Sequence, residues 1–302
     1  MGLKDILPEV LTEFPEMGRT DLRDMKKGID GGFRDFVREY GEVIEGVFYP
    51  LKMFLSWFDR LMIATPWPLL IFIFAVLVWL GSRSWVITIG TVIASLVVGY
   101  LGMWEDMMHT LALISVSTFV CIAIGIPIGI LMAKSDRLQS IVVPILDFMQ
   151  TIPAFVYLIP VLMLVGIGKA PGLIAVCIYA MPPVIRLTDL GIRLVDKDVL
   201  EAADAFGASG RQKMFQVQLP LALPNVFAGV NQTIMMALAM VVVAALIGAP
   251  GLGSNVLKAV NNQYLTLGIM NGSAIVFIAI VFDRVSQRFG KRLQRHTETL
   301  HG

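Results

Sequence analysis

The sequence predicts an all-α integral membrane protein with about seven transmembrane helices. Apolar residues make up 56% of the 302 residues and charged residues 16%, against about 45–50% and about 25% in average soluble proteins. Of the 47 charged side chains, 21 lie in the first 60 residues, so the other 242 residues carry too little charge for a water-soluble surface. A soluble enzyme is therefore disfavoured, and the net charge of +1 offers no basic surface for nucleic acid.

Uncharged intervals predict the spans, because a helix needs about 20 apolar residues to cross the hydrocarbon core of a bilayer. The intervals without Lys, Arg, Asp or Glu are residues 61–82, 84–104, 107–133, 148–168, 170–185, 214–257 and 259–282. Interval 170–185 is short and borrows Leu187 and Thr188. Interval 214–257 begins with prolines and asparagines and ends glycine-rich, which predicts one helix at about 221–247 and then a loop or a short non-spanning segment.

The distribution of basic residues predicts the orientation, because cytoplasmic loops are enriched in Lys and Arg. If loop 186–213 faces the cytoplasm, thirteen basic residues lie on the cytoplasmic side, and only Lys169 and Lys258 lie on the other. We therefore expect the N-terminus outside and the C-terminus in the cytoplasm. The corresponding division is an extracytoplasmic tail over 1–60, a transmembrane domain over 61–290 and a cytoplasmic tail over 291–302.

The first 60 residues are expected to form amphipathic helices. Between Phe33 and Phe48 apolar residues recur at helical spacing, with charged residues on the other faces. Pro50 is expected to interrupt this pattern, which then continues over 51–62. Such helices are expected to lie on the outer membrane surface, and packing against the protein's own spans or a second subunit is the alternative. Residues 1–10 have no apolar core of a signal peptide.

The spans lack the residue patterns of membrane enzymes. The histidines are His109, His296 and His301, so no His-Glu-x-x-His zinc motif exists, and there is no Gly-x-Ser-x-Gly or phosphate-loop motif. We therefore expect no catalytic residues and no metal ligands in this chain. Asp147 alone comes close to an ion-coupling position, and we expect it to be interfacial or capping. A transport protein of this composition needs energy from a partner.

The longest polar loop between late spans carries a helical pattern. Asp198 is the predicted N-cap of a short helix that ends at Phe206, and Gly207 breaks it. A second short helix is predicted to run to about Gln218, where Leu219 and Pro220 stop it and begin the next span. Taken alone, such a loop is also compatible with a solvated connector. Cys121 and Cys177 fall inside spans and are expected to pack as small apolar residues.

The spacing within this loop resembles a known signature. Glu201-Ala202-Ala203, Gly207 after three residues, and Val217-Gln218-Leu219-Pro220 after nine more resemble the EAA motif of ATP-binding-cassette importer permeases, with Val217 where isoleucine is usual. Residues 146–158, 217–220 and 229–233 further resemble the permease subunit of glycine betaine/proline uptake systems. This similarity covers roughly residues 60–290.

The resemblance implies the type I ABC importer permease fold in a bacterial cytoplasmic (inner) membrane. It also implies a homodimer of permeases, two cytoplasmic ATPase subunits that bind ATP and magnesium, and an extracytoplasmic substrate-binding protein, with no cofactor in this chain. Residues 186–220 become a coupling loop within the permease domain over 61–290. The residues implied to couple to the ATPase are Glu201, Ala202, Ala203, Gly207, Leu219 and Pro220. Arg211 and Lys213 either add partner contacts or only mark the cytoplasmic side.

Polar and aromatic residues within the apolar spans are candidates for the substrate pathway. They are Gln150, Thr151, Phe155, Tyr157, Asn231, Gln232 and Thr233. These side chains either line a wet path or bond neighbouring helices, and Phe155 or Tyr157 could face a trimethylammonium group by cation–π attraction. The resemblance implies import of glycine betaine or a related quaternary or methylated amine. The alternatives are an ion-coupled secondary transporter or channel for a small solute, and a membrane-bound enzyme.

Overall fold

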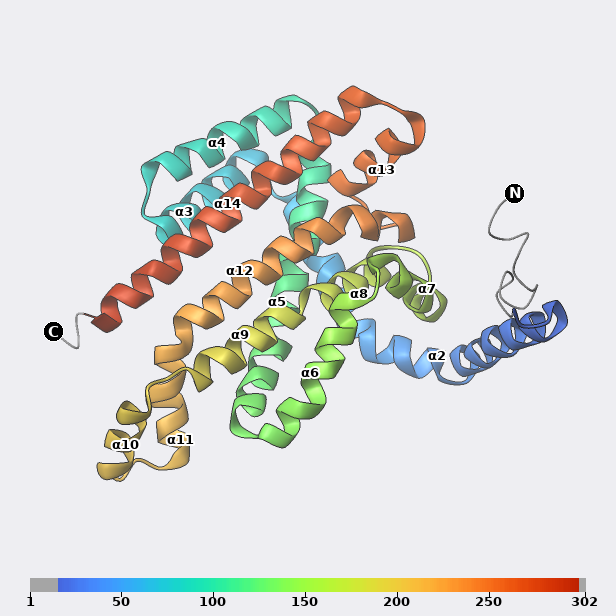
Figure 1. Cartoon of the computed structure of the whole chain (residues 1–302). Helices are drawn as coiled ribbons and strands as arrows, with labels where there is room; N and C mark the ends of the chain where they lie inside the picture. The colour runs from blue at the N-terminus through green and yellow to red at the C-terminus, as the bar shows by residue number, and fades with distance from the viewer. Residues whose placement is uncertain (1–15, 299–302) are drawn as a thin grey trace, which may run out of the picture. The chain divides into compact units, whose positions relative to one another are not determined.

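The computed structural model describes residues 16–298, and no strand occurs among them (Figure 1). The chain divides into two units, whose described parts are residues 16–47 and 48–298. The helices are α2 Arg19–Ala64, α3 Trp67–Ser82, α4 Trp85–Tyr100, α5 Trp104–Lys134, α6 Asp136–Thr151, α7 Ala154–Val165, α8 Lys169–Ala180, α9 Pro182–Arg193, α10 Lys197–Ala205, α11 Gly210–Gln212, the π-helix η2 Lys213–Gln218, α12 Leu219–Ala244, the 3₁₀ helix η3 Ala245–Ile247, α13 Leu252–Asn262 and α14 Leu265–Glu298.

Four helical segments are long and apolar enough to cross a membrane: Trp104–Lys134, Lys169–Arg193, Gly210–Ile247 and Leu265–Gly290. Two bent pairs raise the number of candidate spans to six. The pair α2–α3 is bent by 112° and the pair α6–α7 by 99°, and α4 is a shorter apolar helix. The described chain is therefore an all-helical membrane protein with four to six candidate spans.

Four expected segments differ from the structure in ways that local chemistry explains. Residues 61–82 are not one helix, because α2 ends at Ala64 before Pro66 and α3 begins at Trp67. Residues 148–168 are not one helix: α6 ends before Pro153, because the residue before a proline avoids the helical conformation. Residues 259–282 are also divided, because Gln263 adopts a left-handed conformation (φ 58°) that ends α13. The short interval 170–185 extends through α9 to Arg193, whose charge is paired.

Helix α2 differs from its expected description at Pro50. Pro50 lies inside it and does not divide it, because a proline removes only one backbone donor and kinks a helix more readily than it ends one. In residues 19–47, Phe36 lies 5.2 Å from Tyr40 between ring centroids, so aromatic residues share a face as predicted.

Residues 48–64 of α2 pack within the second unit. Leu55 is buried, and the ring of Phe54 lies 6.2 Å from that of Phe119 on α5. Asp59, only 3% exposed, binds His109 Nδ1 at 2.6 Å and Lys169 Nζ at 2.5 Å. Part of the expected tail therefore packs against the protein's own spans, which was the alternative to the membrane surface.

The centre of the second unit is built from α5, α9 and α12, which approach closely at glycines. A Cβ atom added at Gly129 would lie 2.6 Å from Thr188 Cβ, and one at Gly229 would lie 3.0 Å from Val184 Cα. Small residues allow this approach of helix backbones in membrane proteins. Cys121 and Cys177 are free and buried in the same core, as predicted.

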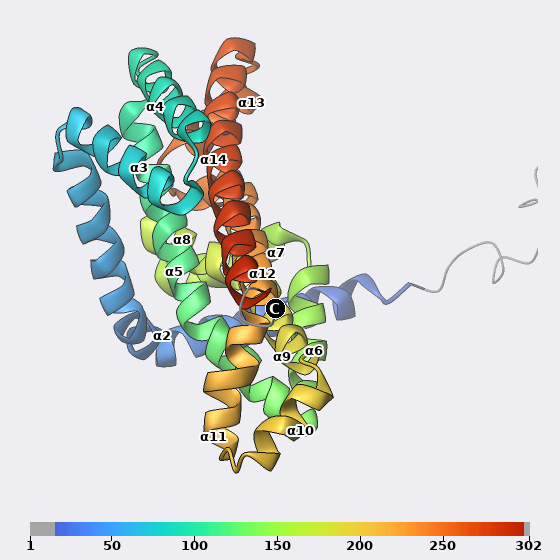
Figure 2. The same cartoon turned by 90° about the vertical axis from the view of Figure 1, so that its left-hand side faces the viewer.

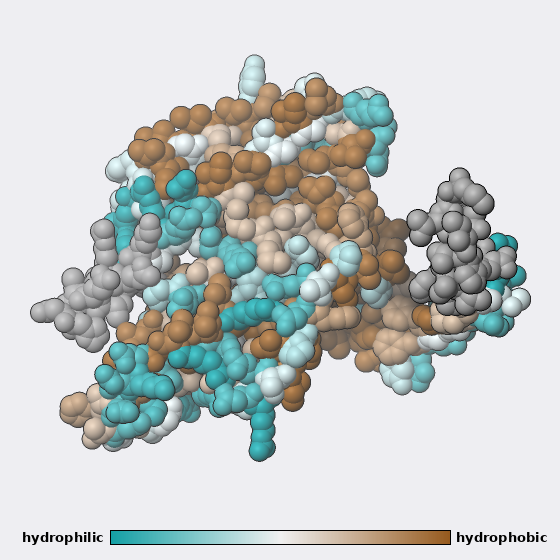
Figure 3. Space-filling model, viewed as in Figure 1, coloured by the Kyte–Doolittle hydropathy of each residue, from teal (hydrophilic) through white to brown (hydrophobic). Residues whose placement is uncertain are grey.

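Helices α3, α4 and α14 lie side by side in both views (Figures 1 and 2). Figure 3 shows mainly apolar side chains over this region and polar ones around α10 and α11. Phe72, Ile89 and Val276 are among the large exposed apolar side chains of α3, α4 and α14. Such a surface suits contact with lipid.

Candidate coupling site

The N-cap of helix α10 lies two residues earlier than predicted. Asp196, not Asp198, is the N-cap, because its carboxylate accepts the backbone amide of Asp198 at 2.9 Å. Asp198 instead lies in the first turn, where a negative charge still faces the positive end of the helix dipole. Figures 1 and 2 both show α10 and α11 at one end of the second unit, beyond α9 and α12.

Gly207 ends α10 in a left-handed turn, as the sequence predicts for a helix break. Its φ is +76°, its amide donates to Asp204 O at 2.9 Å, and the amide of Ala208 donates to Ala203 O at 3.0 Å. This pair of bonds is the Schellman arrangement, which needs a residue with positive φ after the helix. No atom lies within 4 Å of a Cβ added at Gly207, so its conformation and not its packing requires glycine.

The second short helix is fixed to the first. Ser209 and Gln212 form a capping box, with the Ser209 amide 2.9 Å from Gln212 Oε1 and the Gln212 amide 3.4 Å from Ser209 Oγ. Lys213 Nζ lies 2.7 Å from both carboxylate oxygens of Asp204. Of the two basic residues with an open role, Lys213 therefore has a partner inside the loop, and Arg211 is exposed.

The loop is joined to the membrane helices through Met214. This side chain is 3% exposed and packs with Ile192, Ala222 and Val226. The expectation that Leu219 and Pro220 stop the short helix is wrong: residues 210–247 form one continuous helical segment. Pro220 sits in the first turn of α12, where a missing amide costs little, and η2 before it has π-type hydrogen bonding.

The outer surface of the loop is open. Helix α10 has no buried side chain, and Glu201 and Ala202 are exposed while Ala203 is half-buried. Phe206, the last residue before Gly207, is 93% exposed. An exposed aromatic residue among polar and small neighbours is typical of a protein interface. Sequence reasoning missed Phe206, although an apolar residue directly before the predicted helix break was a usable signal.

The seven pathway candidates occupy two places. On α6 and α7, Gln150 and Phe155 are exposed, the Thr151 hydroxyl donates to Phe148 O at 3.2 Å, and the Tyr157 hydroxyl donates to Met149 O.

On α12, Asn231 Nδ2 donates to Asp283 Oδ1 at 3.0 Å, Gln232 is exposed and Thr233 is buried. The hydroxyl of Thr233 has no hydrogen-bond partner among residues 16–298. Within the same residues, no group of three His, Cys, Asp or Glu side chains is arranged to hold a metal ion.

Comparison with known proteins decides the family. Residues 125–295 match the family described as "Binding-protein-dependent transport system inner membrane component". The chain belongs to this family. It is 44% identical over 255 residues to the glycine betaine/proline betaine transport system permease protein ProW of Escherichia coli (strain K12), covering 84% of this chain and 72% of ProW. It is 45% identical over 249 residues to the glycine betaine transport system permease protein OpuAB of Bacillus subtilis (strain 168), covering 82% and 88%.

A solved structure shows the same fold. An inward-facing MetNI methionine ABC transporter chain superposes with a TM-score of 0.57 at 22% identity, over 61% of this chain and 93% of that chain. The permease is therefore a non-catalytic, multi-pass inner membrane component of an ABC importer. Its family implies a substrate-binding protein and an ATPase as partners.

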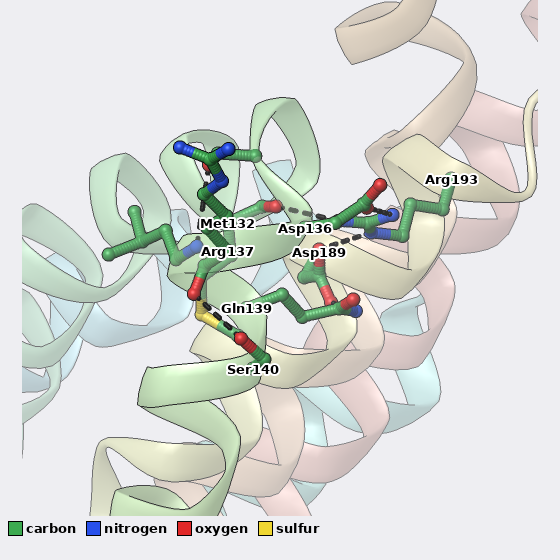
Figure 4. Close-up of polar contacts among 9 residues, drawn as sticks. Met132, Asp136, Arg137, Gln139, Ser140, Asp189 and Arg193 are labelled. Carbon is green, nitrogen blue, oxygen red and sulfur yellow. Dashed lines mark hydrogen bonds and ion pairs between the residues drawn. The ribbon is translucent and has the colours of Figure 1, made fainter.

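In the permease, α9 leads from the membrane core to α10 and carries a polar cluster that sequence reasoning did not foresee (Figure 4). Arg193 binds Asp136 at 2.6 Å and Asp189 at 2.9 Å, and Gln139 Nε2 donates to Asp189 at 2.7 Å. Asp147, expected to be interfacial or capping, lies inside α6 and so does not cap it, and its carboxylate pairs with Arg186 at 2.5 Å.

Proposed function

We propose that the permease imports glycine betaine or a related quaternary or methylated amine. The relatives that share 44–45% identity with most of the chain are permeases of glycine betaine systems, which supports this substrate class. The unit we propose is a homodimer with two cytoplasmic ATPase subunits and an extracytoplasmic substrate-binding protein. ATP and magnesium bind to the ATPase subunits, and this chain carries no cofactor.

The observation that carries the coupling role is the open surface of the α10 turn. Glu201 offers an exposed carboxylate for a basic residue of the ATPase, while Ala202 and Ala203 let another backbone approach. Phe206 offers an apolar anchor that the rest of the permease does not cover. Gly207 holds this anchor in position by its left-handed turn.

The loop is built to pass movement on to the membrane helices. The Lys213–Asp204 pair ties α10 to the start of η2, and buried Met214 ties η2 to α9 and α12. Because η2 runs into α12 through Leu219 and Pro220, the loop cannot shift without moving α12. ATP binding closes the ATPase pair, draws the two coupling loops together and turns the helices toward the outward-open state.

Seven spans with the N-terminus outside and the C-terminus in the cytoplasm complete the proposal. The four long segments, the two bent pairs and the shorter helix α4 together support this number. The uneven distribution of basic residues supports the orientation. Residues 19–47 form an amphipathic helix that suits the outer membrane surface, and residues 1–15 lie outside the described part of the chain.

Among the pathway candidates, we place Gln150, Phe155 and Gln232 in contact with the substrate. Their side chains are exposed on the single chain. An aromatic face such as that of Phe155 attracts a trimethylammonium group. Thr151, Tyr157 and Asn231 already bond within the protein, which favours a structural role for them.

Two substitutions in the loop test the coupling role. Glu201→Lys reverses the exposed charge, and Gly207→Asp adds a charge at a position where Asp tolerates positive φ better than most residues. With the ATPase subunits co-expressed, both variants should lose copurification of the ATPase and substrate uptake. Lys197→Gln, a change at an exposed residue at the start of α10 to which no partner contact is assigned, is the control. Full assembly and wild-type uptake in both variants would contradict the assignment.

A further inference from the structure

Helix α6 buries only part of its apolar surface, and four of its side chains are half-buried against the core: Leu138, Val142, Val143 and Met149. Leu146 is its one buried side chain, while Ile141, Ile145 and Phe148 are exposed. Helices in proteins are normally stabilised by burying an apolar face. The position of α6 therefore depends on other contacts to a larger degree than the positions of α5, α9 and α12.

Those contacts are polar and join α6 to α9. Three cross-helix pairs form what we term the α6–α9 polar ladder: Asp136–Arg193 at 2.6 Å, Gln139–Asp189 at 2.7 Å and Asp147–Arg186 at 2.5 Å. Residue numbers rise along α6 as they fall along α9, so the pairs are the successive contacts of two antiparallel helices. Figure 4 shows the first two pairs.

Asp189 fixes the geometry of the ladder. It is 5% exposed, and its two carboxylate oxygens accept hydrogen bonds from Gln139 Nε2 at 2.7 Å and Arg193 Nε at 2.9 Å. Arg193 Nη2 also donates to Met132 O at 2.8 Å, and this hydrogen bond joins the C-terminal end of α5 to the ladder. A buried charge is tolerated only when its hydrogen bonds are made, so these partners cannot slide independently.

The ladder lies between α10 and the bend of the α6–α7 pair. Helix α9 ends at Arg193 and α10 begins at Lys197, so the first pair adjoins the loop. At its other end α6 turns by 99° into α7. The pair Asp147–Arg186 lies within candidate spans, where charged side chains face protein or water and not lipid.

We propose that the α6–α9 polar ladder carries movement of the coupling loop to α6 and α7. Its members are positioning residues for transport: they hold α6 in register with α9, so that a shift of the loop moves both helices as one body. Because Asp136 and Asp147 are exposed, the register of the two helices depends most on the buried Asp189 and its hydrogen bonds to Gln139 and Arg193. This inference rests on the proposed function, because it requires that α10 receives the force from the ATPase.

Charge reversal at one pair of the ladder tests this. The full complex of permease, ATPase and binding protein is reconstituted in proteoliposomes, with glycine betaine as the substrate, and uptake and ATP hydrolysis are measured together. The variants are Asp147→Arg, Arg186→Asp, the two combined, and Gln139→Leu. The control is Arg137→Asp, because Arg137 is exposed on the same helix and lies outside the ladder.

The ratio of substrate imported to ATP hydrolysed is the readout that a merely structural role would not change. Both single reversals and Gln139→Leu should assemble and hydrolyse ATP while this ratio falls about tenfold, a typical size for a coupling effect. The combined reversal should restore most of it, and Arg137→Asp should match wild type.

Two results would overturn the ladder. The first is an unchanged ratio in the assembled single variants, which includes the case in which uptake and hydrolysis fall in proportion, and the second is no recovery in the combined reversal. If one reversal prevents assembly, Gln139→Leu decides by the same ratio, because it removes a hydrogen bond without reversing a charge. Failure of the proposed function is distinguishable, since the wild-type complex itself would then show no ATP-dependent uptake.

Discussion

Replacing Lys169 by methionine should destabilise the permease much more than replacing Lys258 by methionine. Lys169 Nζ lies 2.5 Å from Asp59, a carboxylate that is 3% exposed and that joins α2 to α5 and α8. Methionine is unbranched like lysine and keeps most of its apolar stem, and it removes the ammonium group. The substitution therefore leaves a buried carboxylate whose remaining partner is His109 at 2.6 Å.

The expected loss of stability follows from this burial. Removing one partner of a buried ion pair costs about 3–5 kcal/mol. We expect the lower value, about 3 kcal/mol, because His109 still bonds Asp59 and the Lys169 side chain is 38% exposed, so water reaches the site. At about 2–4 °C per kcal/mol, the melting temperature should fall by about 6–12 °C.

The assay is thermal unfolding of the purified permease in detergent, followed by the fluorescence of its tryptophans. Lys258→Met is the matched control, because Lys258 is exposed, and its melting temperature should stay within about 2 °C of wild type. Adding Asp59→Asn to Lys169→Met removes the uncompensated charge and should recover part of the loss. If the melting temperature of Lys169→Met equals that of the Lys258→Met control, the ion pair of Lys169 with Asp59 does not stabilise the permease as expected.

Two further predictions concern the coupling loop and the helix core. Phe206→Ala should weaken binding of the ATPase by about 2 kcal/mol, or about 30-fold, because the exposed aromatic side chain is the anchor of the proposed interface. Titration of the detergent-solubilised permease with ATPase measures this affinity. An unchanged affinity would count against Phe206 as the anchor. Gly129→Ala should cost about 1–3 kcal/mol, because its Cβ would lie 2.6 Å from Thr188 Cβ, whereas Gly90→Ala has open space around it and should be neutral or stabilising in the same melting assay.

Local sequence signals predicted the larger features correctly. Uncharged intervals are a direct consequence of burial in lipid, so the spans of α5 and α12 were visible in the sequence. The glycine of the coupling turn was also predictable, because the break at Gly207 depends on its own conformation. The bend at Ile152 was missed because the hydropathy of residues 148–168 is uniform, although the following Pro153 signals it.

Contacts between distant parts of the chain were beyond sequence reasoning. Asp59 meets partners that are 50 and 110 residues away, and no local pattern relates them. The same holds for Asp189 and Gln139, which are 50 residues apart. The sequence instead presented Asp147 as a lone acid near a span, whereas the structure gives it Arg186 as a partner.

The most direct test of the importer mechanism is the energy source of uptake. Proteoliposomes contain the permease and its ATPase. The binding protein and labelled glycine betaine are added on the side of the membrane opposite to the ATPase. We predict uptake that requires ATP on the ATPase side, that continues when sodium and proton gradients are collapsed, and that Glu201→Lys abolishes. Uptake by the permease alone, driven by an ion gradient and indifferent to ATP, would contradict it.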